Sequence, residues 1–239
     1  MPREEAIVTQ EHEKMNERFG SDRPVEPPPH PQPPPPRPNP LPPGRFSLTF
    51  DGFFAFNIRA LETDTLWLLT AVSTLNSNIN PMSASQVKFL GDVHGNDLFN
   101  NVSFTPLSQP VEVNPGTFGA PLKFGHLLLN YGHAQDPAEY IRLNAGGVLL
   151  EVVTYFDPIG GAPSIDSMNE SINASLNHTF AGCDGCVAFH VFALSWEDLV
   201  QGTQTTTPFQ LSSEEPGFPS PWQCGAQSHY QVYWSIRRV

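Results

Sequence analysis

The sequence predicts a mainly β protein: an antiparallel β-sandwich with an inserted helical hairpin, preceded by a disordered, polyproline N-terminal arm. Residues 1–44 are charged and proline-rich, whereas residues 45–239 contain short runs of Val, Phe, Leu and Thr broken by Gly, Pro and Asn. The first of these runs alternates polar and apolar residues, as a half-buried strand does. Two stretches near residue 150 instead place apolar residues at helical spacing. Residues 45–239 are long enough for one well-buried all-β domain.

The arm of residues 1–44 contains an unusually dense proline tract. Half of the 26 prolines lie between Pro24 and Pro43. Because proline fixes φ and removes an amide donor, we expect an extended polyproline II segment there. Such a segment can be a stiff spacer, an assembly arm or a ligand for a proline-binding groove. As a ligand it would bind partners through Arg37, Pro40 and Pro43. These residues recur every third position, with the basic residue first.

Short strands account for most of residues 45–239. In the first predicted strand, Leu48, Phe50 and Gly52 face one way, and Ser47 and Thr49 face the other. Short strands joined by Pro, Gly and Asn are typical of antiparallel sandwiches. The predicted strands are residues 46–60, 65–75, 86–93, 102–105, 123–131, 187–195 and 230–237.

A helical insertion is predicted at about residues 136–180. For the first helix, Asp136 is the expected N-cap and Pro137 fits the first turn. For the second, Ser164 is the expected N-cap. We expect the hairpin to cover one face or edge of a sheet. Its apolar stripe consists of Ile165, Met168, Ile172, Leu176 and Phe180.

The charge balance disfavours several classes of partner. The chain has a net charge of −12, and residues 45–239 hold most of the acidic excess. Such a body repels nucleic-acid backbones and anionic membranes, and the hairpin is too polar for deep membrane insertion. No secretory leader and no apolar run of spanning length is visible. A cytoplasmic location is therefore the default expectation, although another export route stays open.

Two of the three cysteines lie in the stretch GCDGC, residues 182–186, and several roles are open for them. A redox pair is disfavoured because the first thiol does not start a helix. A zinc site could use Cys183, Cys186, Cys224 and His229, with His190 as another fourth ligand. A disulfide could instead join Cys224 to Cys183 or to Cys186, and three reduced thiols are also compatible with the sequence.

Other candidate chemistry is weak. A calcium site could use the loop residues Asp92, His94 and Asp97 together with Asp51, Asp64 or Asp184, but a solvated turn is the favoured interpretation. The residues His126 and His133, which flank a strand, are expected to be structural or exposed. Motifs for nucleophilic, metal-dependent or phosphate-binding catalysis do not occur in the sequence.

Three motifs resemble those of an uncharacterised group of bacterial and fungal proteins. The motifs are CDGCVAFHVF at residues 183–192, SPWQCGAQSHYQVYWS at residues 220–235, and the opening segment with Asn57, Arg59, Asp64 and Thr65. The likeness covers about half of the body. The cysteines that match the group are Cys183 and Cys224, whereas Cys186 stands where the group has proline. The resemblance therefore implies a Cys183–Cys224 pair, and it implies no activity.

The expected function is a non-enzymatic binding or assembly module whose arm makes or spaces contacts with a protein partner or a second copy. One alternative is an enzyme or small-molecule binder with a cavity between sandwich and hairpin. A second alternative is a membrane-active protein that uses the hairpin. No cofactor is expected, with zinc or calcium as the alternatives given above.

Overall fold

A computed structural model of the chain describes residues 44–74, 83–100, 111–113, 122–132, 136–203, 207–216 and 222–239. The chain divides into two units, Met1–Asn39 and Pro40–Val239, and every described residue belongs to the second unit. The proposed partner-binding residues Arg37, Pro40 and Pro43 lie outside the described residues, as do His133 and the predicted strand at 102–105.

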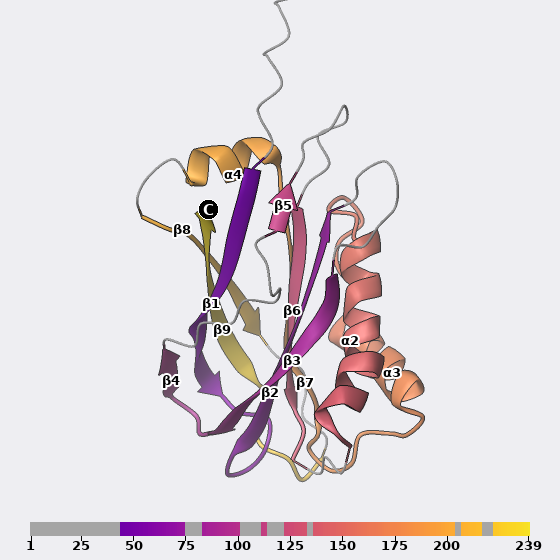
Figure 1. The fold of residues 1–239 in the computed structure, drawn as a ribbon. Coiled ribbons are helices and arrows are strands. Elements are labelled where there is room, and N and C mark those ends of the chain that lie inside the picture. Colours follow the sequence, from indigo (N-terminus) through magenta and orange to yellow (C-terminus); the bar gives the residue numbers. More distant parts are fainter. Residues whose placement is uncertain are drawn as a thin grey trace, which may run out of the picture. The chain divides into compact units, whose positions relative to one another are not determined.

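Within the described residues, strands alternate with one helical hairpin and one short helix (Figure 1). The elements in chain order are β1 Gly44–Asn57, β2 Asp64–Thr74, β3 Ser83–Val93, β4 Asp97–Asn100, β5 Val111–Val113, β6 Leu122–Asn130, α2 Ala138–Tyr155, α3 Ile165–Leu176, β7 Gly185–Leu194, α4 Trp196–Gly202, β8 Phe209–Pro216 and β9 His229–Arg238.

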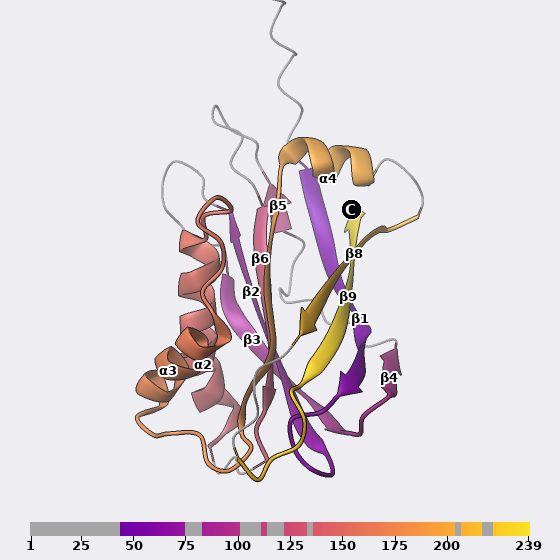
Figure 2. The same cartoon turned by 180° about the vertical axis from the view of Figure 1, so that it is seen from behind.

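The strands form two antiparallel sheets, which confirms the predicted sandwich with inserted helices. Sheet A has the order β4-β1-β9-β8, and β5 also pairs with β1. Sheet B has the order β3-β2-β6-β7. The two helices of the hairpin lie beside sheet B, on the side away from sheet A (Figures 1 and 2).

Two apolar cores result from this layering. The first lies between the sheets and contains Phe50, Leu68, Phe124 and Trp234, all 1% exposed or less. The second lies between sheet B and the hairpin. Strand β6 is buried at every residue because it is an inner strand of sheet B with a core on each face. This explains why its sequence is apolar without alternation.

The inward face of β1 changes phase at Gly52. Phe46, Leu48 and Phe50 point into the core, as the alternation predicts. A bulge between Phe50 and Gly52 then shifts the register, and Gly52 has a φ of 140°. Beyond it Phe53 points inward. Gly52 was predicted to belong to the inward series, but its role is to end that series, because a glycine accepts the backbone angle of the bulge.

The helical hairpin begins and packs largely as predicted. The side chain of Ser164 caps α3 by accepting a hydrogen bond from the amide of Ser167. The predicted stripe is buried against sheet B at Ile165, Met168, Ile172 and Leu176, and Phe180 packs beside it. The Asp136 cap is wrong: Pro137 holds the N-cap position of α2 without a side-chain cap, and the Asp136 carboxylate instead binds Tyr131 and His178.

The C-terminus of α2 is capped from another element. This helix has no basic residue in its last turn, but Lys123 of β6 donates hydrogen bonds from Nζ to the carbonyls of Thr154 and Phe156. The ammonium group therefore lies at the negative end of the helix dipole. Among the described residues, no helix is long and apolar enough to cross a membrane.

Candidate functional site

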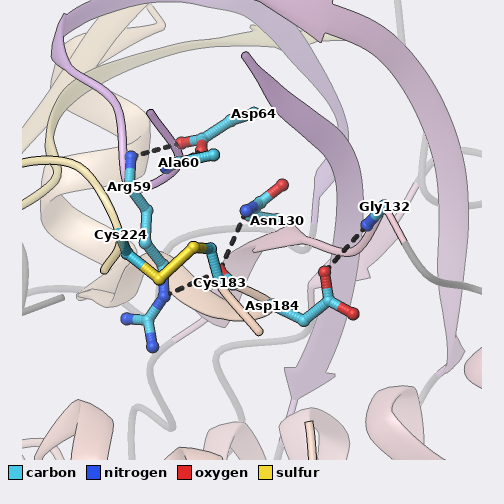
Figure 3. The surroundings of a disulfide bond; sticks show 8 residues. All are labelled: Arg59, Ala60, Asp64, Asn130, Gly132, Cys183, Asp184 and Cys224. Atoms are coloured by element: carbon cyan, nitrogen blue, oxygen red, sulfur yellow. Dashed lines mark hydrogen bonds between the residues drawn. A yellow bond between two sulfur atoms is a disulfide. The ribbon is translucent and has the colours of Figure 1, made fainter. Parts of the chain in front are cut away.

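The cysteines of the two resembling motifs form a disulfide at one end of the sandwich (Figure 3). Cys183 precedes β7 in sheet B, and Cys224 precedes β9 in sheet A; their Cα atoms are 5.6 Å apart. The bond therefore ties the turn before a strand of one sheet to the turn before a strand of the other. This confirms the pairing that the resemblance implies, out of the two pairings that the spacing left open.

Asp64 lies next to this disulfide and is fully buried. Its carboxylate accepts hydrogen bonds from the amides of Arg59 (2.9 Å) and Ala60 (2.7 Å) and from the Tyr230 hydroxyl (2.6 Å). Burial raises the pKa of Asp64, while these donors and the Arg59 guanidinium oppose the rise. Burial beside this carboxylate also raises the pKa of Tyr230. The carboxylate thus fastens the turn after β1 to β9.

The main-chain carbonyl of Cys183 is held from two sides. Arg59 Nε and Asn130 Nδ2 each donate a hydrogen bond to it at 2.9 Å (Figure 3). Asn130 also accepts a hydrogen bond from the amide of Thr65. In the same turn, Asp184 accepts one from the amide of Gly132. Loops from both sheets therefore converge on the turn that carries GCDGC.

Gly225 and Gly185 allow this close approach. The Gly225 amide donates to the Arg59 carbonyl at 2.8 Å, and a Cβ built on Gly225 would lie 2.3 Å from the carbonyl oxygen of Ala60. Gly185 has a φ of 143°, and its Cβ would meet the Arg59 guanidinium. The three segments that carry the resemblance therefore meet at one end of the sandwich, where their polar groups bind one another.

The zinc alternative does not match this geometry. Cys183 and Cys224 are joined to each other, and Cys186 is fully buried in the core between sheet B and the hairpin, which raises the pKa of its thiol. His229 is paired with Glu214 at 2.9 Å, and the other candidate, His190, lies 3.2 Å from Glu215. Within the described part of the chain, no three His, Cys, Asp or Glu side chains gather in a metal-binding group.

The calcium alternative is likewise not assembled among the described residues. Asp92 accepts a hydrogen bond from the Thr65 hydroxyl, and Asp97 accepts one from the His94 amide, as in a polar turn. The other three candidates have partners of their own: Asp51 binds Ser235, Asp64 binds Tyr230, and Asp184 binds Gly132.

His126 lies at the centre of the sandwich, and the prediction of a structural role for it fits its contacts. It is fully buried, and Trp234 Nε1 donates to its Nδ1 at 3.2 Å. A neutral imidazole then carries its proton on Nε2, which faces Ser213 Oγ at 3.5 Å. With its proton on that nitrogen, His126 cannot take the Ser213 proton, so this pair does not form an activated serine nucleophile.

Burial, with a smaller contribution from the neighbouring His190, lowers the pKa of His126 from 6.5 to about 3. His190 is partly exposed at the edge of sheet B, and its Nδ1 lies 3.2 Å from Glu215 Oε1 without the alignment of a hydrogen bond. His126 is therefore a neutral core residue at physiological pH, and its charge state matters for stability.

Sequence reasoning missed a cluster on the outer side of sheet A. After the bulge at Gly52, Phe54 and Phe56 point away from the sandwich core, with ring centroids 4.6 Å apart. His229 stacks on Phe56 at 4.5 Å, and Leu98 is paired with Phe54 across the β1–β4 register. We call Phe54, Phe56, Leu98 and His229 the aromatic face.

The aromatic face is partly open to solvent. Phe56 is 36% exposed and Leu98 is 57% exposed. Among the described elements, the hairpin covers the outer side of sheet B and leaves this side of sheet A bare (Figure 2). The signal in the sequence was the stretch FFAFN, residues 53–57, which is apolar on both strand faces after Gly52. The solvated face of an antiparallel sheet commonly carries polar residues, so the outward Phe54 and Phe56 depart from the usual pattern.

No protein-family model matches the chain, and no curated protein matches it. Three features of the structure bear on function. They are the hydrogen-bonded turns around the Cys183–Cys224 disulfide, the buried His126 with its partners, and the aromatic face.

Proposed function

We propose that the protein is a non-enzymatic assembly module, in which the proline-rich arm makes contacts with other copies and the sandwich is the platform that receives them. The aromatic face is the observation that carries this proposal. Large apolar side chains gathered at the surface of a water-exposed sheet are typical of interaction sites.

The polar clusters of the sandwich support a structural role for its interior. The Asp64 carboxylate accepts three hydrogen bonds, and the Cys183 carbonyl accepts two. His126 is held in the tautomer that cannot activate Ser213. These buried groups hold the loops and sheets together, whereas Phe54, Phe56 and Leu98 on sheet A point away from the core and can make contacts.

The arm supplies matching chemistry. A polyproline II segment exposes proline rings and loses little conformational entropy on binding, and it docks on aromatic side chains. Arg37, Pro40 and Pro43 place one basic and two apolar groups at three-residue intervals, on one edge of such a helix. The arm and the aromatic face thus give one chain both halves of a recognition pair.

Sedimentation velocity of the full-length chain tests this function. We expect the mean mass to rise over about two decades of concentration around 10 μM, a range suited to weak association. The variant Arg37→Ala/Pro40→Ala/Pro43→Ala should stay monomeric. The matched control Pro27→Ala/Pro28→Ala/Pro29→Ala also replaces three residues of the tract, three prolines where the test variant replaces two. It should assemble as the natural chain does.

Two results would overturn the proposal. The first is a natural chain that remains a monomer throughout this concentration range. The second is an Arg37/Pro40/Pro43 variant that assembles as strongly as the natural chain.

A further inference from the structure

We infer that the aromatic face is the docking site for the proline-rich tract of a second copy, with Arg37 of that copy at Glu214 and its Pro40 on Phe54. This inference rests on the proposed function and adds to it the surface, the orientation and the residue pairs.

One row of side chains crosses the outer side of sheet A. The strand register places Leu98 of β4 opposite Phe54 of β1, Phe54 opposite Gln231 of β9, and Gln231 opposite Glu214 of β8. Directly opposed residues of antiparallel strands lie on the same side of a sheet. The row therefore runs from an apolar end at Leu98 and Phe54 to an acidic end at Glu214.

The spacing of this row matches the spacing of the tract. Glu214 and Phe54 are two strand separations apart, which is about 10 Å at about 4.8 Å per strand. Arg37 and Pro40 are three residues apart, which is about 9 Å at about 3.1 Å per polyproline II residue. A tract lying across the strands with Arg37 at Glu214 thus places Pro40 over Phe54 and Phe56, and Pro43 beyond them toward Leu98.

The charges are complementary along the same line. Arg37 is the only formally charged residue between Pro27 and Gly44. The Glu214 side chain is 61% exposed and is paired with His229, which itself stacks on Phe56. The acidic group and the aromatic rings are therefore parts of one contiguous surface. Because the body is strongly acidic, a tract with a single positive charge is attracted to it, and the position of Glu214 sets the direction in which the tract lies.

A contact of this kind is heterologous, because the arm of one copy meets the face of another. A pair of copies still has one free arm and one free face, so contacts of this kind give rings or open chains. Because the arm and the face that meet belong to different copies, charge reversals made in two separate variants should restore the contact when the variants are mixed. Association with another cause would not be restored by mixing.

The test uses charge reversal in the full-length chain. Arg37→Glu places a negative charge against Glu214, and Glu214→Arg places a positive charge against Arg37. Each variant alone should associate at least about tenfold more weakly than the natural chain, because like charges then face each other. An equimolar mixture of the two should regain association, because every arm then finds a face of opposite charge on the other variant.

Apolar contact is tested separately by Phe56→Asp, which should also weaken association about tenfold or more by removing the ring that supports the prolines. Leu143→Asp is the matched control: Leu143 is 59% exposed on α2, beside the other sheet, and its replacement should leave association unchanged. Equal thermal midpoints for all four variants establish that the fold is intact.

The outcomes distinguish this inference from the proposed function. If the Arg37/Pro40/Pro43 variant loses association but Glu214→Arg and Phe56→Asp do not, the arm is the assembly element and the aromatic face is not its site. If the mixture of the charge-reversed variants stays as weak as each variant alone, the assigned pair is wrong. A Phe56→Asp variant that loses only binding to lipid vesicles would assign the face to a membrane instead.

Discussion

Removing the Cys183–Cys224 disulfide should cost the sandwich a large part of its stability. The bond closes a stretch with a sequence separation of 41 and joins sheet B to sheet A. In the chain-entropy description, a cross-link of this span restricts the unfolded chain by about 4 kcal/mol at 25 °C. Domains commonly unfold with about 5–15 kcal/mol. The double variant Cys183→Ser/Cys224→Ser should therefore fold with a much smaller margin.

Urea unfolding followed by tryptophan fluorescence measures this loss, since Trp234 is fully buried and becomes exposed on unfolding. With a slope of about 2 kcal/mol per molar urea, the midpoint should fall by about 2 M. The natural chain in reducing buffer is the matched control, because it loses the same bond without a change of sequence. Both samples keep the buried Cys186 thiol.

A loss of less than about 1 kcal/mol in both samples would refute this reasoning. The hydrogen bonds that Asp64 makes with Arg59, Ala60 and Tyr230 would then hold the two sheets without the covalent bond. A loss in the double variant that is absent in the reduced natural chain would point instead to the serine substitutions themselves.

Two further predictions concern His126 and a pair of glycines in α2. Burial lowers the pKa of His126 from 6.5 to about 3. Between these two pH values the unfolded chain binds a proton that the folded chain does not. The stability of the fold is therefore retained above pH 6.5 and lost as the pH falls below it. At pH 5 this residue lowers the free energy of unfolding by about 2 kcal/mol. The urea midpoints at pH 7 and pH 5 should therefore differ less in His126→Gln than in the natural chain. An equal difference in the two proteins would contradict the assignment. In α2, Gly147→Ala should raise the thermal midpoint, because nothing lies within 4 Å of the added Cβ and alanine favours a helix by about 1 kcal/mol. The neighbouring change Gly146→Ala should lower the midpoint, because its Cβ would lie 2.5 Å from the Ser85 hydroxyl. Equal changes of the midpoint at the two positions would show that packing against β3 does not determine the effect.

Elements with local signals could be predicted from the sequence. The stripe of Ile165, Met168, Ile172 and Leu176 marks α3 because a helix repeats every 3.6 residues, and Ser164 marks its start because a hydroxyl can cap the free amides of a first turn. The short elements β4, β5, α4 and β8 were not predicted. The strands among them are brief or polar, and they form because neighbouring strands supply their hydrogen-bond partners. Helix α4 did have a local signal, the capping box of Ser195 and Asp198, which the sequence-based prediction did not use.

The cysteines show where residue spacing alone reaches its limit. From the sequence, Cys224 had two possible partners, and the resemblance favoured Cys183 without a geometric reason. The reason lies in the fold: Cys186 is the second residue of β7 and its side chain points into the core beneath the hairpin, whereas Cys183 lies in the turn at the end of the sandwich. Only two residues, Asp184 and Gly185, separate a buried thiol from one that can reach another sheet.

The sequence by itself determined the alternation of the strands, the helical hairpin and the change of composition at the end of the arm, because each depends on residues close together in the chain. Only the tertiary structure decided which distant groups meet. Asp136 binds Tyr131 and His178 instead of capping α2, and Lys123 caps the end of that helix from a strand. Such contacts depend on the strand order and on where each strand shifts its register, and a pattern of neighbouring residues carries no information about either.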